Sequence, residues 1–226
     1  MKAWNDLPSQ FQNEEVRPYY DKLKKKGVSL VFKRIFDIII ALLLIIILAI
    51  PMFVIAVLIK LDSSGPVFYR QERVTKYGKH FRIFKFRTMV ANADKIGAHV
   101  TSNNDSRVTV IGNKLRDLRL DELPQLLNVI TGDMSFVGTR PEATRYVEKY
   151  TDEMWATLLL PAGITSEASI RYKDEAELLE KAEDADETYI NQVLPAKMKY
   201  NLNSLENFSF IGDIRTMFRT IVAVFN

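Results

Sequence analysis

The longest apolar stretch of the chain runs from Ile38 to Ile59 and contains 22 residues without a charged side chain. A helix rises about 1.5 Å per residue, so this stretch is long enough to cross a hydrocarbon core of roughly 30 Å. Pro51 lies inside it, where the ring removes one helical hydrogen bond and crowds the carbonyl of Ile47. The pattern therefore predicts a membrane helix that is broken at Pro51.

Alternation of apolar and polar residues follows this helix. It extends over residues 67–70 and 80–87, and the sequence Tyr77-Gly78 lies between the two segments. A period of two residues is typical of strands, and a turn between two such strands predicts a β-hairpin. Ser63-Ser64-Gly65-Pro66 marks a turn where the chain leaves the apolar stretch.

Helical periodicity returns in two later segments. One apolar stripe predicts an amphipathic helix whose first turn contains Pro124, and its members are Leu120, Leu123, Leu126, Leu127 and Ile130. A second stripe, with spacings of 3, 4, 3 and 4, is formed by Ile211, Ile214, Phe218, Ile221 and Phe225. We interpret the second stripe as a face that packs on the core or on a membrane surface.

Charge is distributed unevenly along the chain. Residues 1–90 hold 16 Lys and Arg against 7 Asp and Glu, and residues 91–226 hold 15 against 21. Basic residues lie on both sides of the apolar stretch, so the positive-inside rule assigns both flanks to the cytoplasm and predicts a re-entrant helix. A kinked spanning helix is the alternative, because proline is tolerated in spanning helices. Without a nucleic-acid-binding motif, the basic residues favour an anionic membrane surface over nucleic acid.

Composition limits the chemistry further. The 226 residues are 47% hydrophobic, which is enough for one ordinary core in addition to a membrane segment. The chain has no cysteine, which excludes disulfides, thiolate metal sites and thiol nucleophiles. His80 and His99 have no metal-binding spacing, and we interpret both as solvated.

Two adjacent acids, Asp121 and Glu122, stand at the start of the first amphipathic helix. The segment Gly132–Pro141, which follows that helix, is rich in turn residues and carries Arg140. Unpaired N–H groups at a helix N-terminus stabilise a carboxylate as the anion and can also bind phosphate. The pattern predicts a site for phosphate chemistry with Asp121 as an ionised nucleophile.

These residues also carry a family resemblance. The segment Arg116–Pro141 closely resembles the bacterial monotopic phosphoglycosyl transferases, which are the initiating sugar-phosphate transferases of surface-glycan and glycoprotein pathways. The resemblance covers most of residues 33–141, including the motifs Lys33–Asp37 and Phe84–Met89, and is weak beyond them. Several motifs in one order are far more specific than any one of them.

The resemblance implies transfer of a sugar phosphate from a UDP-sugar to polyprenol phosphate, with release of UMP. Asp121 is then the nucleophile that forms an acyl phosphate with the sugar-bearing phosphate. Glu122 completes a catalytic dyad and helps to bind a metal or to manage a proton. The metal is most simply Mg²⁺, held by Asp121 and Glu122, because a hard divalent cation matches oxygen ligands and diphosphate charge.

The substrate phosphates are expected to meet four basic side chains. Arg116 and Arg140 match family arginines and can present a planar donor fork to phosphate oxygens. Lys85 and Arg87, on the second predicted strand, either coat the sheet or point towards a phosphate, and the family pattern favours the phosphate. The alternative to phosphate binding is that each arginine forms a surface ion pair.

The predicted fold is α+β. It comprises an N-terminal arm or interfacial helix (1–32), a broken re-entrant membrane helix (33–61) and a small, mainly helical cytoplasmic catalytic domain (62–226). That domain contains a short β-hairpin and amphipathic interfacial helices. The expected location is the cytoplasmic face of the bacterial inner membrane, in contact with UDP-sugar, polyprenol phosphate and membrane lipid. The sequence leaves open a homodimer, the choice of UDP-sugar and the role of the acidic segment 172–187.

Lys33, Arg34 and Asp37 share one helix face at the start of the apolar stretch. We interpret them as a local ion pair that anchors the helix at the headgroups; the alternative is that Lys33 or Arg34 binds the phosphate of the acceptor. Three positions depart from the family pattern: Ile50 replaces a serine before Pro51, Thr139 replaces a proline, and residues 161–171 lack the family's polar recognition segment.

Two other functions fit the same residues. A membrane-bound, Mg²⁺-dependent phosphohydrolase would also use an aspartate and phosphate-binding arginines. A non-catalytic membrane scaffold of a glycan assembly would retain the fold without turnover, although the intact Asp121 and Glu122 argue against it. Dependence on a lipid acceptor separates the transferase from the hydrolase.

Overall fold

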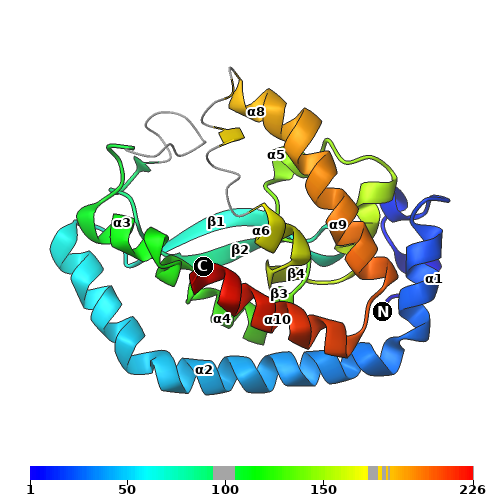
Figure 1. Cartoon of the computed structure of the whole chain (residues 1–226), viewed down its shortest axis with the longest axis horizontal. Helices are drawn as coiled ribbons and strands as arrows, with labels where there is room; N and C mark the ends of the chain where they lie inside the picture. Colours follow the sequence, from blue (N-terminus) through cyan, green and yellow to red (C-terminus); the bar gives the residue numbers. More distant parts are fainter. Residues whose placement is uncertain (94–104, 173–177, 180–181, 183, 226) are drawn as a thin grey trace.

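The structure is a computed structural model that describes residues 1–93, 105–172, 178–179, 182 and 184–225. A long apolar helix, α2 (Gly27–Asp62), runs along one side of a mostly helical α+β body that contains two small sheets (Figure 1). α2 is long and apolar enough to cross a membrane. The predicted α+β class with a long apolar N-terminal helix is confirmed. His99 and much of the acidic segment 172–187 lie outside the described residues.

The other helices and strands complete the body. In chain order they are α1 (Arg17–Lys25), β1 (Phe68–Val74), β2 (His80–Phe86), α3 (Val110–Asp117), α4 (Gln125–Thr131), β3 (Met134–Val137), α5 (Thr144–Val147), β4 (Ala162–Thr165), α6 (Glu167–Arg171), α8 (Ala185–Thr188), α9 (Leu194–Glu206) and α10 (Phe210–Phe225). Short 3₁₀ turns include η5 (Leu120–Glu122) and η6 (Glu153–Leu159), and η7 (Tyr189–Val193) is a π-helical turn before α9.

α2 stays helical across Pro51, so the predicted break is not an interruption of the helix. Figure 1 shows α2 curving instead, with its C-terminal part turning up towards α3. A proline removes a single i→i−4 hydrogen bond, so the turns on either side can continue while the axis bends. The expectation of a bent apolar helix is met, whereas the expectation of a broken one is corrected.

The start of α2 is fixed to the body by side chains that the sequence placed in a local ion pair. Lys33 Nζ instead bonds Asp213 Oδ2 of α10 at 2.6 Å. Arg34 donates to the carbonyls of Val129 and Ile130, and Ser135 Oγ donates to Asp37 Oδ2 at 2.8 Å. The prediction of a local ion pair among Lys33, Arg34 and Asp37 is therefore wrong.

The end of α2 is fixed in the same way by Arg87, which follows β2. Its Nη1 and Nη2 atoms donate to the carbonyls of Ser64 and Ser63 at 2.8 and 2.7 Å, and Nη2 also donates to Ser63 Oγ at 2.9 Å. Only 5% of Arg87 is exposed. The last carbonyls of a helix have no helical partner, so a buried guanidinium beside them stabilises the helix end.

The predicted β-hairpin is confirmed. β1 and β2 pair antiparallel from Phe68↔Phe86 to Val74↔His80. The turn between them contains Tyr77 and Gly78, both with positive φ (60° and 74°). β1 is longer than the alternation indicated, because Gln71, Glu72 and Arg73 continue the strand as polar residues.

A second sheet was not predicted from the sequence. β3 and β4 pair in parallel, with Met134 opposite Ala162 and Ser135 opposite Gly163. Four-residue strands are too short to give a clear period of two. At the end of this pairing, a Cβ atom on Gly163 would lie 2.2 Å from the backbone nitrogen of Gly138, so only glycine permits the two backbones to approach.

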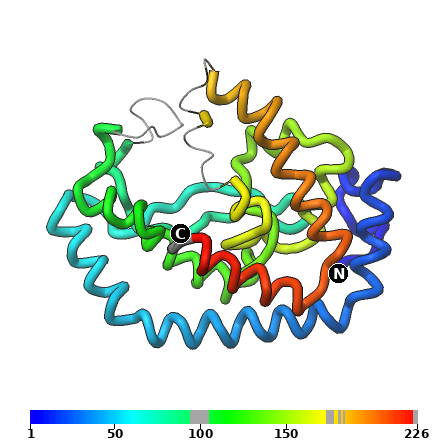
Figure 2. Tube along the Cα trace, viewed as in Figure 1, coloured from blue at the N-terminus to red at the C-terminus, as the bar shows by residue number. Residues whose placement is uncertain are grey.

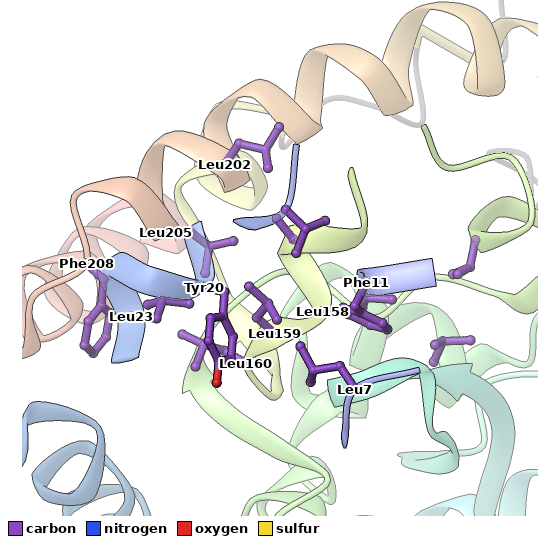
Figure 3. Packing of buried hydrophobic residues seen from close by; sticks show 14 residues of the cluster. Leu7, Phe11, Tyr20, Leu23, Leu158, Leu159, Leu160, Leu202, Leu205 and Phe208 are labelled. Atoms are coloured by element: carbon purple, nitrogen blue, oxygen red, sulfur yellow. The ribbon is translucent and has the colours of Figure 1, made fainter. Parts of the chain in front are cut away.

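The N-terminal residues are packed on the body and are not a loose arm. Figure 3 shows Leu7, Phe11, Tyr20 and Leu23 among apolar residues of η6 and α9. Phe11 and Leu23 have no exposed surface, and Tyr20 has 1%. Burial of such side chains contributes about 1.5–3 kcal/mol each, which explains why this segment holds its place.

A second core joins α2 to the rest of the body. Ala41 of α2 is fully buried against a cluster that includes Phe81 of β2, Val129 of α4 and Met134 of β3. α10 lies beside α2 (Figure 2), and Met217 of α10 packs against the same cluster. The face of α2 turned away from the body is apolar and exposed.

Candidate active site

The two candidate catalytic acids lie where the sequence placed them, immediately before an amphipathic helix. Asp121 and Glu122 belong to η5, Pro124 caps the next helix, and α4 begins at Gln125. Arg119, just before η5, has a left-handed backbone (φ 54°) that is uncommon for a residue with a side chain. This turn presents both carboxyl groups on the side of β2 and Arg140.

Glu122 is held by two cations from different parts of the chain. Its Oε1 atom lies 2.7 Å from Lys85 Nζ of β2 and 2.9 Å from Nη2 of Arg140, which follows β3. Burial alone would raise the pKa of Glu122, but the charges and hydrogen bonds of Arg140 and Lys85 outweigh it and hold that pKa well below its usual range. The two cations therefore favour the charged form of Glu122.

Asp121 has a different environment, although it adjoins Glu122. Only 9% of the residue is exposed, and its Oδ2 lies 3.8 Å from Lys85 Nζ, at the outer limit of an ion pair. Burial raises the pKa of Asp121 above its usual value; Lys85 opposes this shift and the neighbouring Glu122 reinforces it. Burial therefore opposes the stabilisation of the anion that we expected from helix N–H groups. A raised pKa makes the ionised carboxylate a stronger nucleophile.

The structure distributes the predicted phosphate-binding residues unequally. Lys85 and Arg140 converge on the dyad. Arg116 of α3 lies near enough for its charge to lower the pKa of Asp121. Arg87 does not take part as expected: both of its terminal nitrogens are engaged with the end of α2, so this prediction is corrected to a role in helix capping.

A cavity of about 280 Å³ opens beside the dyad. Its apolar wall is formed by α2 through Leu44 and Leu48, together with Phe136 of β3 and Ile164 of β4, and its polar residues include Glu122 and Arg140. The cavity therefore joins the membrane-type helix to the charged site, an arrangement that suits a ligand with an apolar chain and an anionic head.

Sequence reasoning missed Arg119, which lines the same cavity. Within the described part of the chain its guanidinium has no ion pair, and the side chain is exposed. Its position two residues before Asp121 was the signal available, but a surface arginine on a helix end gives the same pattern.

The site's oxygen donors are suited to a magnesium ion bound together with a diphosphate. In the described residues no three acidic or histidine side chains converge into a metal-binding cluster. Magnesium, however, is commonly held by only one or two carboxylates, with substrate phosphates and water as its other ligands. The adjacent Asp121 and Glu122 match that smaller donor set.

The structure combines a long apolar helix with a charged site, and sequence comparison identifies the family of the chain. The model of the bacterial sugar transferase family matches residues 28–226. The chain therefore belongs to the bacterial sugar transferase family.

Three relatives illustrate its neighbours within the family. The UDP-N-acetylgalactosamine-undecaprenyl-phosphate N-acetylgalactosaminephosphotransferase of Aeromonas hydrophila is 39% identical over 84% of this chain and 42% of its own length. The UDP-glucose:undecaprenyl-phosphate glucose-1-phosphate transferase of Escherichia coli K12 is 37% identical over 91% of this chain and 42% of its own length. The exopolysaccharide production protein PSS of Rhizobium leguminosarum bv. phaseoli is 36% identical over 87% of this chain and 96% of its own length. The chain thus spans less than half of the first two relatives and nearly all of the third.

Proposed function

We propose that this chain transfers a sugar 1-phosphate from a UDP-sugar to undecaprenyl phosphate, releases UMP and so initiates synthesis of a polysaccharide. The observation that carries the proposal is the meeting of the Asp121–Glu122 dyad with Lys85 and Arg140 at the edge of an apolar cavity. Two relatives are transferases named for a UDP-sugar and undecaprenyl phosphate, which supports the same substrates here.

The proposed reaction has two displacements at one phosphorus atom. In the first, an Asp121 carboxylate oxygen attacks the sugar-bearing β-phosphorus, and the bond to the bridging oxygen breaks as UMP leaves with the electron pair. In the second, a phosphate oxygen of the lipid attacks the same phosphorus and Asp121 leaves as a carboxylate. The product is a lipid-linked diphosphosugar, and the enzyme is restored.

The side chains around Asp121 have different roles in this reaction. Lys85 and Arg140 neutralise charge that develops on the phosphoryl oxygens and on UMP. Glu122 fixes both cations by its short contacts, so they are in place before the substrate arrives. Arg116 adds positive potential from α3. A Mg²⁺ ion held by Asp121 and Glu122 would supply further neutralisation of the diphosphate when bound.

The apolar cavity fits the lipid acceptor. Leu44, Leu48 and Phe136 offer a hydrocarbon surface for the first isoprene units, and Arg140 at the polar part can bind the lipid phosphate. This assignment brings the attacking phosphate to the dyad from the membrane side.

We also propose that α2 is re-entrant at the cytoplasmic face of the bacterial inner membrane. Both of its ends are bound to one folded body, the first through Arg34 and Asp37 and the second through Arg87. The outer face of α2 and exposed residues of α10, including Ile211 and Phe218, are apolar. A helix whose two ends hold the same soluble body favours entry into one leaflet over a crossing of both.

The topology can be tested with single cysteines at Met1 and Asn226, since the chain has no native cysteine. We expect both positions to react with a membrane-impermeant maleimide only from the cytoplasmic side. Pro51→Ala should allow a straighter helix and move a fraction of molecules towards a spanning arrangement. Labelling of the two positions from opposite sides would refute the re-entrant arrangement.

Activity should require a divalent cation, because the dyad offers oxygen ligands beside a diphosphate. We expect a chelator to abolish UMP release and added Mg²⁺ to restore it. Undiminished turnover after complete removal of divalent ions would contradict the metal assignment.

Replacement of Lys85 by methionine should move the acid limb of the pH–rate profile to higher pH. Asp121 attacks only when ionised, and Lys85 lowers its pKa, so removal of that charge raises the pKa further. We expect the limb to rise by about one pH unit, together with a lower maximal rate. Lys79→Met, on the exposed turn of the same hairpin, is the matched control and should leave the limb in place. An unmoved limb in Lys85→Met would argue against Asp121 as the titrating group.

The activity itself is tested by UMP release from a panel of UDP-sugars, with and without undecaprenyl phosphate. A transferase forms a lipid-linked product in the presence of the acceptor. Release of free sugar phosphate without lipid would indicate a phosphohydrolase. Absence of turnover across the whole panel would indicate a scaffold.

A further inference from the structure

A second cavity, of about 490 Å³, shares Arg140 with the apolar cavity beside the dyad. Its walls come from β1 through Arg73, from the segment Pro141–Tyr146, and from Tyr189 and Lys197 near the start of α9. Arg140 therefore borders both spaces. Whatever binds in the second cavity is adjacent to the same guanidinium that contacts Glu122.

The second cavity is rich in positive charge. Its lining contains four basic side chains, Arg73, Arg140, Arg145 and Lys197, against two acidic ones, Glu72 and Glu142, which gives a formal excess of two positive charges. A nucleotide sugar carries two negative charges on its diphosphate, so the lining itself has the complementary sign of charge, although Arg140 and Arg145 also pair with Glu122 and Asp186 outside the lining. A hydrocarbon chain, in contrast, would have to displace water from these groups at a cost.

Much of the lining is held rigid by contacts within the protein. Tyr189 Oη donates to Glu142 Oε1 at 2.6 Å, and Lys197 Nζ donates to Tyr189 Oη at 3.1 Å. Glu142, Tyr189 and Lys197 are all less than a tenth exposed. This buried network forms a fixed wall of the cavity.

Arg73 differs from the other cations because its hydrogen-bond acceptor is a neutral amide: its Nη2 atom donates to Gln71 Oε1 at 2.6 Å. Among the described residues no carboxylate lies within 4.0 Å of its guanidinium. Burial lowers the pKa of Arg73; Glu142 opposes that shift, and the like charge of Arg140 adds to it. Two guanidinium groups that destabilise each other's charge form a site that an anion would stabilise.

We propose that this cavity binds the nucleotide-sugar donor and that Arg73 and Arg140 together hold its diphosphate. The inference rests on the proposed transferase function and adds the place where the donor binds. Each guanidinium can donate a planar pair of hydrogen bonds to phosphate oxygens. The size of the cavity lies within the range of small-molecule sites. The donor and the lipid then reach Asp121 from two different cavities that meet at Arg140.

The test measures binding apart from turnover. Asp121→Asn protein in nanodiscs is titrated with UDP-sugar by calorimetry, and Arg73→Gln is added to that background. We expect the donor Kd to rise about 10- to 100-fold, as loss of a charge-assisted contact predicts, while undecaprenyl phosphate binds as before. Arg73→Lys should recover part of the loss. Arg82→Gln, an exposed arginine on β2, is the control and should leave the donor Kd unchanged.

A second variant covers the case in which Arg73→Gln does not fold. Thr144→Trp adds a large ring at a half-buried lining position without removing a charge, and it should abolish donor binding while circular dichroism and acceptor binding persist. If the Asp121→Asn protein binds the donor and both variants in that background bind it equally well, the assignment of the donor to this cavity is wrong, whereas the proposed transferase function is unaffected. If the Asp121→Asn protein, without a second substitution, binds no UDP-sugar at all, both the proposed transferase function and the proposed donor cavity are wrong.

Discussion

Asp121→Asn should reduce turnover by on the order of 10⁴-fold or more, the scale seen when a covalent nucleophile is removed. An amide nitrogen or oxygen cannot replace the carboxylate oxygen that attacks phosphorus, and the neighbouring carboxylate of Glu122 is engaged by Lys85 and Arg140. The loss should appear in the first displacement, so UMP release disappears even without acceptor. UMP release under saturating donor is the measurement.

The Asp121→Asn protein must be shown to remain folded and able to bind donor. Circular dichroism and calorimetric titration with UDP-sugar serve this purpose, and Asp117→Asn at the exposed end of α3 is the matched control. We expect near-normal turnover in Asp117→Asn. Turnover in Asp121→Asn within tenfold of the parent would rule out a nucleophilic role for Asp121.

Glu122→Gln should reduce kcat by about 10²- to 10³-fold, the usual effect of losing one preorganised electrostatic contact. Glu122 is the shared anion for Lys85 and Arg140, and a neutral amide would leave the two cations without their anchor. The rate of UMP release is compared with that of Glu148→Gln, an exposed control.

A second readout separates this role from simple unfolding. Glu122 contributes to the raised pKa of Asp121, so its removal lowers that pKa. The acid limb of the residual activity should therefore move to lower pH, in the opposite direction from Lys85→Met. A limb that moves upwards, or a kcat equal to that of Glu148→Gln, would contradict the assigned role.

Elements with strong local patterns could be predicted from the sequence. The hairpin followed from alternation around Tyr77-Gly78, and the helix after Pro124 followed from leucine spacing. The β3–β4 sheet was missed because its four-residue strands pair across more than twenty residues and depend on the close approach of Gly138 and Gly163. Such an approach is a tertiary property that no local pattern records.

The errors have a common physical origin. Lys33, Arg34 and Asp37 are helical neighbours, so a local ion pair was the natural interpretation. Their partners are instead on β3, α4 and α10, distant in the sequence. Arg87 was expected at a phosphate, yet unpaired carbonyls at the end of α2 lie nearer to it. In each case, the need to satisfy buried polar groups decided the contact.

Several residues of the candidate site that were chosen from the sequence lie close together in the structure, whereas their roles stay predictions. Asp121, Glu122, Lys85 and Arg140 were chosen from motifs and do converge in the structure. The division of labour within the dyad could not be predicted, because it depends on burial and on which carboxylate the two cations reach. The two cavities that share Arg140 are lined by elements from most of the chain, including α2, β1, β3, β4 and α9, so no single segment carries a pattern that predicts them.

Intact-protein mass spectrometry after incubation with UDP-sugar and without acceptor tests the central claim most directly. The proposed mechanism predicts a mass increase of one sugar phosphate, located on Asp121 by peptide mapping, that disappears when undecaprenyl phosphate is added. An unmodified protein that nevertheless releases UMP, or an adduct on any other residue, would contradict it.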